Sequence, residues 1–461
     1  MMGQQCRKES LFYYFRLEDQ VPETHLLRLI DRYIDFSFVR DRLRNFYSQT
    51  GRPSIDPEVL LRLLLVGYLY GITSERRLLD EVRMHLAYRW FTGLGFDREL
   101  PDHSTFSKNR HGRFRAAGVF RDVFEEIVRR CIAAGLVEGR HLTVDGTLVQ
   151  ANASPHRRVA PEQLAEVARV SHTVREYLAE LEQQNPVADP AARAPADLKA
   201  AARTVSASDP DAAWAVKWGR AGFAYFDNYL IDNASRVIVG VEATPARFSQ
   251  EALAARRMLA QVEQLGLCPE SLGADKAYGS GEFLAGLLAR GVQPHIPVID
   301  RRHQTGGRFT REQFRYAPEE NTYYCPEGQP LRYRRAHPTA HGNIYNATTG
   351  QCRGCPQKPR CTPGAFRKLF VHREEPARTT VRALAGTPAY ERSRRDRYKV
   401  EALFAELKQR LRLGRVRLRR LWNVAEQFHL AAIHLAATAQ NLKRLVQFIA
   451  RGQPVPTPST P

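Results

Sequence analysis

The hydrophobic periodicity of the chain changes at Gly139, and this change constrains the fold more than any other feature. Up to about Arg130, apolar residues recur every three or four positions, as in HLLRLIDRYIDFSFVRDRL, and Pro57 suits the first turn of a helix. After Gly139, the β-branched stretch from Leu142 to Val149 predicts a strand. We therefore expect an all-α module followed by a region that contains a sheet.

Further strands and a crossover helix follow. The segments FAYFDNYLID and SRVIVGVEAT predict two strands joined at Asp232 and Asn233, and the apolar run Val237 to Val241 suits a central strand covered on both faces. The segments SLGADKAYGS, GEFLAGLLARG and QPHIPVID then predict a strand, a helix and a strand. This pattern indicates an α/β fold with a mixed sheet and flanking helices.

A length of 461 residues and a hydrophobic content of 43% suit about three packed domains. We predict a helical domain at 1–135, a first part of the sheet-containing domain at 136–300 with a helical excursion at 160–213, a Cys-rich insertion at 301–376, a C-terminal part of the sheet-containing domain at 377–450 and a mobile tail at 451–461.

The charge of the chain is strongly positive. With 69 Lys and Arg against 49 Asp and Glu, the net charge is +20, which suits nucleic acid, an anionic membrane surface or an acidic partner. The apolar tracts are interrupted by polar residues, so a cytoplasmic protein is expected. Much of the charge lies in one C-terminal stretch, at Arg392, Arg394, Arg395, Arg397, Lys399, Lys408, Arg410, Arg412, Arg415, Arg417, Arg419 and Arg420.

Three acids suit a metal-assisted phosphoryl-transfer site. Asp145 lies within the first predicted strand, and Asp275 lies where a later strand exits into a Gly-Ser-Gly turn. Glu401 lies on a predicted helix. Magnesium prefers oxygen ligands, and two such ions stabilise the attacking and leaving oxygens of an in-line displacement. Asp227 and Asp232 are alternatives to Asp145 as a metal ligand.

The helix that bears Glu401 has two interpretations. Arg394, Arg397, Glu401 and Lys408 follow one another at spacings of three, four and seven, which places them on one face, away from the apolar stripe. That face suits a metal-binding carboxylate flanked by cations that contact phosphates. The same residues also suit a solvated helix, in which Arg397 and Glu401 form an i,i+4 pair worth a few tenths of a kcal/mol. Asp396 and Glu406 are weaker candidates because neither shares the face as well.

Four cysteines gather in one polar segment, at Cys325, Cys352, Cys355 and Cys361. In a reducing compartment such clustering favours a structural zinc ion bound by four thiolates over disulfides. The segment also carries arginines and tyrosines. It suits either a module that grips DNA or a folded surface insertion with exposed cations.

Some conspicuous residues have structural interpretations. Asp102 and His103 are expected to begin a helix, with Asp102 near its N-cap. We expect His429 and His434 to be packing or capping residues, and Trp90 to belong to a core. The chain has no P-loop or GxGxxG motif in a strand-to-helix setting.

Taken together, the motifs LPDHSTFSKNR, LTVDGTLVQANAS, LGADKAYGSGEF and VEALFAELKQRLRLGRVR resemble those of DDE-type insertion-sequence transposases. The resemblance covers nearly the entire chain. It implies a ribonuclease-H-like catalytic domain whose Asp145, Asp275 and Glu401 form the DDE triad and bind Mg²⁺ or Mn²⁺, with two ions expected. Where the family's third motif has Tyr, this chain has Arg394. The cations expected to contact DNA are Arg394, Arg397, Lys408 and Arg412.

The function implied is DNA transposition. Such an enzyme binds the terminal inverted repeats of its own element, cleaves the ends and joins the 3′-hydroxyls to target DNA. We expect a homodimer in a synaptic complex, in the nucleoid of a bacterial cell. Two alternatives stay open, a non-cleaving relative that binds DNA or represses the element, and a metal-dependent nuclease acting on other nucleic acid.

Overall fold

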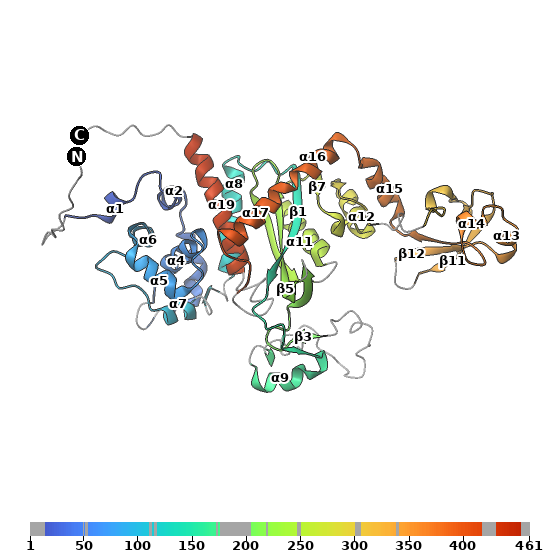
Figure 1. The fold of residues 1–461 in the computed structure, drawn as a ribbon. Coiled ribbons are helices and arrows are strands. Elements are labelled where there is room, and N and C mark those ends of the chain that lie inside the picture. Colours follow the sequence, from blue (N-terminus) through green and yellow to red (C-terminus); the bar gives the residue numbers. More distant parts are fainter. Residues whose placement is uncertain are drawn as a thin grey trace, which may run out of the picture.

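Helices, a six-stranded sheet and a separate five-stranded sheet follow one another across the molecule in a computed structural model (Figure 1). The described residues are 14–48, 50, 54–109, 113–114, 118–171, 174–175, 204–217, 220–246, 250–299, 306–337, 341–416 and 430–452. Within them, no helix combines the length and apolar character needed to span a membrane.

The N-terminal region is helical, as predicted. Its helices are α1 (Leu17–Gln20), α2 (Leu26–Tyr33), α3 (Phe38–Leu43), α4 (Pro57–Leu69), α5 (Glu75–Met84), α6 (Leu86–Thr92), α7 (His103–Asn109) and α8 (Val119–Ala133). Helix α4 begins at Pro57, and the Asp56 side chain accepts a 2.8 Å hydrogen bond from the Glu58 N–H. The proline and the cap together define this helix start.

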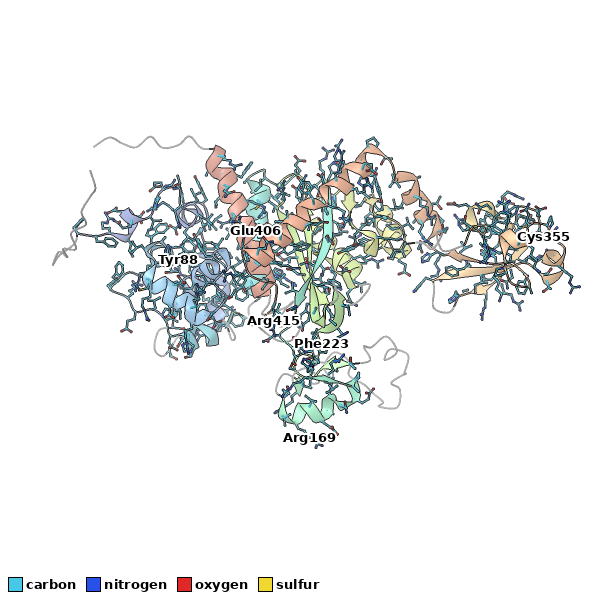
Figure 2. The ribbon with its side chains drawn as sticks, viewed as in Figure 1. Tyr88, Arg169, Phe223, Cys355, Glu406 and Arg415 are labelled. Carbon is cyan, nitrogen blue, oxygen red and sulfur yellow. The ribbon has the colours of Figure 1, made fainter. Side chains whose placement is uncertain are left out.

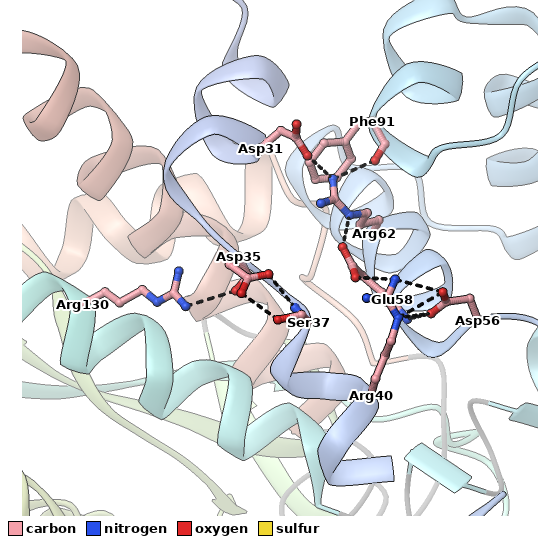
Figure 3. Close-up of polar contacts among 9 residues, drawn as sticks. All are labelled: Asp31, Asp35, Ser37, Arg40, Asp56, Glu58, Arg62, Phe91 and Arg130. Carbon is pink, nitrogen blue, oxygen red and sulfur yellow. Dashed lines mark hydrogen bonds and ion pairs between the residues drawn. The ribbon is translucent and has the colours of Figure 1, made fainter. Parts of the chain in front are cut away.

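One arginine of α4 stabilises the packing of these helices (Figure 3). Arg62 interrupts an apolar run, and its guanidinium donates at 2.9 Å to Glu58 and at 2.9 Å to the Phe91 carbonyl, while it also pairs with Asp31. Its side chain is only 15% exposed. Arg62 therefore connects α2, α4 and α6. Its positive charge is paired with Glu58 and Asp31 within the protein.

The six-stranded sheet is mixed, as predicted. Its strands are β1 (His141–Gln150), β4 (Ala213–Lys217), β5 (Arg220–Asp232), β6 (Ile238–Pro245), β7 (Ser271–Gly273) and β8 (Gln293–His295). Their order is β4-β5-β1-β7-β8, and β6 also pairs with β5. Strand β5 runs antiparallel to β1, whereas β7 is parallel to both β1 and β8. The crossover between β7 and β8 contains α12 (Gly281–Ala289), as predicted.

The expectation that Val237 to Val241 forms a central strand is wrong. Strand β6 is paired with β5 alone among the described strands, so it lies at an edge of the sheet. It is buried because α11 (Gln250–Gln264) and α19 (Leu430–Gly452) both pack against it. The Asn441 side chain, on α19, exchanges hydrogen bonds of 2.9 and 2.8 Å with the backbone of Ile238. The apolar run from Val237 to Val241 therefore predicted the burial of β6 correctly, but it did not predict that β6 lies at an edge of the sheet.

Helices cover both faces of this sheet. Helix α11 lies on one face, where Met258 packs over Gly240, while α17 (Tyr398–Gln409) and α19 lie on the other, where Tyr229 contacts Phe404 and Gln440. Helices α15 (Glu375–Leu384) and α16 (Pro388–Asp396) precede α17 in the chain. Because α19 also packs on α2, α4 and α8, one apolar core joins the sheet to the N-terminal helices.

The described part of the predicted excursion after β1 includes helix α9 (Leu164–Val170). It is flanked by β2 (Arg158–Val159) and β3 (Val205–Ser206), which pair with each other. The run EQLAEVARVSHTVREYLAELEQQ, expected to be helical, is interrupted at Ser171, which is extended, and residues 174 and 175 are helical again. Its remainder from residue 176 lies outside the described residues, as do residues 417–429 of the predicted C-terminal helix and residues 453–461 of the predicted tail.

The Cys-rich segment forms an antiparallel sheet of its own, far from the N-terminal helices (Figure 1). Its strands, in the order β13-β12-β11-β10-β9, are β9 (Arg315–Ala317), β10 (Thr322–Tyr324), β11 (Pro330–Ala336), β12 (Gly342–Asn346) and β13 (Lys368–His372). The short helices α13 (Thr349–Arg353) and α14 (Lys358–Cys361) lie between β12 and β13.

Candidate active site

Asp145 and Asp275 lie at neighbouring positions on two adjacent parallel strands. Strands β1 and β7 pair Thr143 with Gly273, and each aspartate follows two residues later. Asp275 lies just past the end of β7 and caps a short 3-10 turn, where its side chain accepts a 2.8 Å hydrogen bond from the Ala277 N–H. The sheet register therefore brings together two acids that are 130 positions apart in the sequence.

Helix α17 carries Glu401 to the same place. The predicted continuous helix is interrupted at Arg397, which separates α16 from α17. The Arg397 guanidinium lies 3.8 Å from the Asp145 carboxylate, and Glu401, one turn further along, is exposed. Arg397 thus extends to the first strand, where it contacts the acid of β1.

The electrostatics of Asp145 show how closely the acids are grouped. Burial, together with the negative charges of Asp275 and Glu401, raises the pKa of Asp145 to about 6, although the Gly146 N–H and Arg397 oppose the shift. A desolvated carboxylate near two others favours either a proton or a nearby cation. This arrangement of oxygen donors suits a divalent metal ion.

Lys408 points into the protein, toward the strands of the sheet. Its Nζ donates a 2.6 Å hydrogen bond to Thr147 Oγ1, two residues beyond Asp145 on β1. Thr147 is paired across the sheet with Asp227, which is fully buried. Burial raises the pKa of Asp227 well above its usual range, and the charge of Lys408 opposes this. Lys408 therefore joins the Glu401 helix to the strand that bears Asp145.

The other predicted DNA contacts are exposed. Arg394 is paired with Glu391 at 2.8 Å on the surface of α16. Arg412, which follows α17, is exposed with a φ of 56°. The segment after it runs alongside the end of β1, where Gln150 and Arg415 form a bridge. Arg417, Arg419 and Arg420 lie outside the described residues.

The weaker acidic candidates have structural partners. Glu406 contacts α19 through Gln440, Lys443 and Arg444 (Figure 2). Asp396 forms a 2.9 Å ion pair with Lys399. Asp232 accepts hydrogen bonds from the backbone of Gly139 and Ser235. Hydrogen bonds and ion pairs within the protein therefore explain the positions of Glu406, Asp396 and Asp232, and no bound metal ion is needed to explain them.

The four clustered cysteines line one small cavity beside the five-stranded sheet. Burial raises the pKa of the Cys361 thiol, and Cys352, Cys325 and Cys355 add to the effect, so the four sulfurs are neighbours. At Cys325 the chain forms a tight turn in which the Gln329 N–H donates to the sulfur at 3.3 Å. The donor chemistry suits zinc.

Neither cluster is already arranged around a common metal position. Among the residues that the structure describes, no group of three or more His, Cys, Asp or Glu side chains is placed to hold a metal ion.

Two protein-family models match parts of the chain. The family "Transposase domain (DUF772)" matches residues 15–112, and the family "Transposase DDE domain" matches residues 324–446, which include Glu401. The resemblance to DDE-type transposases is confirmed. Asp145 and Asp275 lie outside both matched ranges. No curated protein sequence matches the chain.

A solved structure also matches, the cryo-EM structure of a piggyBac transposase synaptic complex with hairpin DNA. The two sequences are 10% identical over 94% of this chain and 82% of that chain, with a TM-score of 0.31. At that score the match says nothing of how this chain is arranged.

Sequence reasoning missed two residues beside the acids. Tyr278 is fully buried three residues after Asp275, and burial raises the pKa of its hydroxyl well above the usual range, with Glu251, Asp145 and Asp275 adding to the effect. Glu251, on α11, lies close behind β1, since its Oε1 is 2.6 Å from where a Cβ on Gly146 would be. A Cβ at position 146 would require the Glu251 carboxylate and the Asn228 side chain to shift. Apart from its distance along the chain from the acids, nothing in the sequence marks either Tyr278 or Glu251 as part of the site.

The structural interpretations of other residues are confirmed where they fall in the described chain. Asp102 accepts a 2.8 Å hydrogen bond from the Ser104 N–H at the start of α7. His434 is buried and meets Phe124 edge to face. Trp90 packs against the core beneath Arg28. His429 lies outside the described residues.

Proposed function

We propose that this transposase binds the terminal inverted repeats of its own insertion sequence, cleaves the ends and joins them to target DNA. The observation that carries the proposal is the convergence of Asp145 and Asp275 on adjacent strands beside Arg397 and the Glu401 helix. Cleavage is hydrolysis of a phosphodiester at the element end. The freed 3′-hydroxyl then attacks a phosphodiester of the target DNA. Like the cleavage step, this is a displacement at phosphorus.

The catalytic unit is proposed to be ribonuclease-H-like. Support comes from the central position of β1, which has an antiparallel neighbour, β5, on one side and a parallel neighbour, β7, on the other. We assign 136–300 and 377–450 to this unit, 1–135 to DNA binding or dimerisation, 301–376 to the Cys-rich insertion and 451–461 to a tail.

Asp145, Asp275 and Glu401 are proposed to hold Mg²⁺ or Mn²⁺, with two ions bound. When bound, such ions activate water and stabilise the attacking and leaving oxygens. Arg397 balances the Asp145 charge, and Lys408 holds α17 against β1. The exposed cations Arg394 and Arg412 are proposed to contact phosphates of the end DNA.

Cys325, Cys352, Cys355 and Cys361 are proposed to bind a structural zinc ion. The shared cavity and the N–H donated to the Cys325 sulfur support this assignment. Four protein ligands close the zinc coordination sphere and leave no position for substrate.

The test uses purified protein, Mg²⁺ and DNA that carries the sequences flanking its gene. Paired cleavage at inverted repeats, followed by joining in a complex with two protein copies, is the expected result for an enzyme that acts at the bacterial nucleoid. Sequence-independent degradation would instead indicate a nuclease, and binding without cleavage would indicate a repressor.

Single changes at the acids identify the site. Asp145→Ala, Asp275→Ala and Glu401→Ala should each abolish cleavage and leave end binding largely intact. Asp396→Ala is the matched control, because Asp396 precedes the same helix but pairs with Lys399. Full cleavage by any of the three variants would remove that residue from the site.

A further inference from the structure

We infer that one face of the five-stranded sheet is a second DNA-binding surface, which grips the sugar-phosphate backbone of duplex DNA beside the cleavage site. The surface, called here the open face, comprises Arg315, Tyr324, Arg332, Arg335, Ile344, Asn346, Lys368 and Phe370. The inference rests on the proposed action on DNA and adds to it a binding surface outside the carboxylate site.

The strand register places these residues on one side. Arg332 pairs across β11 and β12 with Asn346, which pairs in turn with Lys368 on β13. One row further along, Arg335 is opposite Ile344, and Ile344 is opposite Phe370. Directly opposed residues project to the same side of a sheet. A bulge between Tyr333 and Arg335 adds one residue, Arg334, to β11. Because of this extra residue, Arg335 lies on the same side of the sheet as Arg332.

The other side of the same sheet is mostly buried, although Tyr316 and Tyr333 on that side are exposed. Its rows contain Tyr323 with Leu331, Tyr345 with Leu369, and Val371, all of them buried. These residues form a core with Phe314 and Cys361, against which Cys325 and Cys352 pack. The cysteine cavity lies beside Leu331 on this side, whereas Arg315, Arg332, Arg335, Lys368 and Phe370 of the open face are exposed.

The cations of the open face are exposed and unpaired. Arg315, Arg332, Arg335 and Lys368 are all exposed, and within the described chain none of them forms an ion pair with a carboxylate. By contrast, Arg367 on the same segment is turned inward and donates to the carbonyls of Cys361 and Phe309. The charge of the open face is thus available for an external polyanion.

Two aromatic side chains add flat apolar surface between these cations. The Phe370 ring is 43% exposed and lies over Gly342, where an added Cβ would be 2.5 Å from the ring. Tyr324 lies under the Arg315 guanidinium, which is 4.8 Å from the ring centroid. Cations interspersed with aromatic rings suit a nucleic acid, whose phosphates and sugars present charge and apolar surface together.

The open face leads toward the carboxylate site. His372, at the end of β13, lies 2.6 Å from where a Cβ on Gly281 would be, at the start of α12. Gly281 is six residues after Asp275. Lys368 is four residues before His372, or about 13 Å at a strand rise of about 3.3 Å per residue. Duplex DNA bound along β13 would therefore approach the edge of the sheet that bears the aspartates.

The experiment compares two matched pairs of substitutions in the full-length protein. Arg332→Ala with Arg335→Ala removes two charges from the open face, and Arg308→Ala with Arg353→Ala removes two exposed charges from the same segment outside it. Binding of a duplex that carries the element end is measured by fluorescence anisotropy in EDTA at several KCl concentrations. Thermal melting of each protein is recorded in parallel.

The open-face pair should weaken binding about tenfold near 0.1 M salt and reduce the slope of log K against log salt by about 2, since each neutralised phosphate contributes about 0.9. The control pair should change the slope by less than about 0.5. Equal effects of the two pairs, or none, would overturn the inference. A change in protein self-association with unchanged DNA affinity would also overturn it, because the face would then bind a second copy.

Two further measurements keep the outcome clear. If the alanine pair lowers the melting temperature, Arg332→Gln with Arg335→Gln preserves the side-chain length and is used instead, with the same result expected. Because binding is measured without Mg²⁺, loss of affinity supports the open face even if the carboxylate site fails to cut DNA. Retained affinity with active cleavage overturns the open face alone.

Discussion

At the start of α17 and on that helix, Arg397 and Lys408 point toward Asp145 and Thr147 of the six-stranded sheet. In the five-stranded sheet, by contrast, Arg332 and Arg335 are exposed without a carboxylate partner among the described residues. Both regions are strongly basic in sequence. The difference teaches that a cation beside buried acids compensates their charge, while a cation on an uncovered sheet face is free to bind a polyanion. The following predictions test this contrast.

The largest effect is expected at Asp145, where activity and stability should separate. Asp145→Asn should reduce DNA cleavage by about a thousandfold or more, because the variant loses a charged oxygen ligand. It should also stabilise the metal-free protein at pH 8. Burial holds the pKa of this carboxyl at about 6, above the ordinary value of 3.8, so the folded state favours its protonated form.

The sign of the pH dependence follows from that shift. The stability contributed by Asp145 is fully present below about pH 3.8 and is lost as the pH rises through about 6. Denaturant unfolding in EDTA should show Asp145→Asn more stable than the wild type by up to about 3 kcal/mol at pH 8, with the difference disappearing near pH 4. Asp396→Asn should show no such gain. An unchanged unfolding free energy at pH 8 would contradict the burial of this charge.

The next effect concerns the inward-facing Lys408. Lys408→Met should lower the free energy of unfolding by about 3 kcal/mol, because it leaves Asp227 buried without its nearby cation. Adding Asp227→Asn should restore most of that loss. The salt dependence of DNA binding should match that of the wild type. A reduced salt slope with unchanged stability would instead show that Lys408 contacts phosphates.

A smaller effect is expected at the cysteine cavity. Cys355→Ser should remove zinc from the purified protein and lower the melting temperature, because the five-stranded sheet has only a small core of its own. Metal analysis should give one zinc per wild-type chain. Cys268→Ser is the matched control, since Cys268 is exposed and far from the cavity in sequence. Wild-type protein without zinc would contradict this assignment.

The smallest effect is expected on the open face. Phe370→Ala should weaken DNA binding about threefold and leave the salt slope unchanged, because it removes apolar contact without removing charge. Its control is Tyr398→Ala, which removes an exposed aromatic ring from α17 instead. Equal losses for both variants would show that the open face has no special role.

The sequence predicted most of the framework. The β-branched stretch around Asp145 predicted β1, and the strand, helix and strand pattern around Asp275 predicted β7, α12 and β8 of a mixed sheet. The four cysteines were recognised from their spacing alone. Family resemblance supplied the pairing of Asp145 with Asp275 and Glu401, which neither periodicity nor composition contains, since the sheet register joins positions far apart in the chain.

Other features depended on contacts that a linear pattern does not encode. The apolar run of β6 had the composition of a central strand, but helices α11 and α19 bury it at an edge. Helical periodicity put Lys408 on the face of Glu401, and yet its long side chain reaches Thr147 across the helix–sheet interface. Tyr278 and Glu251 approach the acids from a turn and from a different helix.

By itself, the sequence determined where strands and helices form and which residues carry acids, thiols and positive charge, because local periodicity and residue chemistry are properties of neighbouring positions. Only the tertiary structure decided which of those charges are neutralised inside the protein. Arg62, Arg367 and Lys408 are turned inward, whereas Arg332 and Arg335 stay exposed. The physical reason is that burial and pairing depend on which surfaces meet, and those surfaces come from distant parts of the chain.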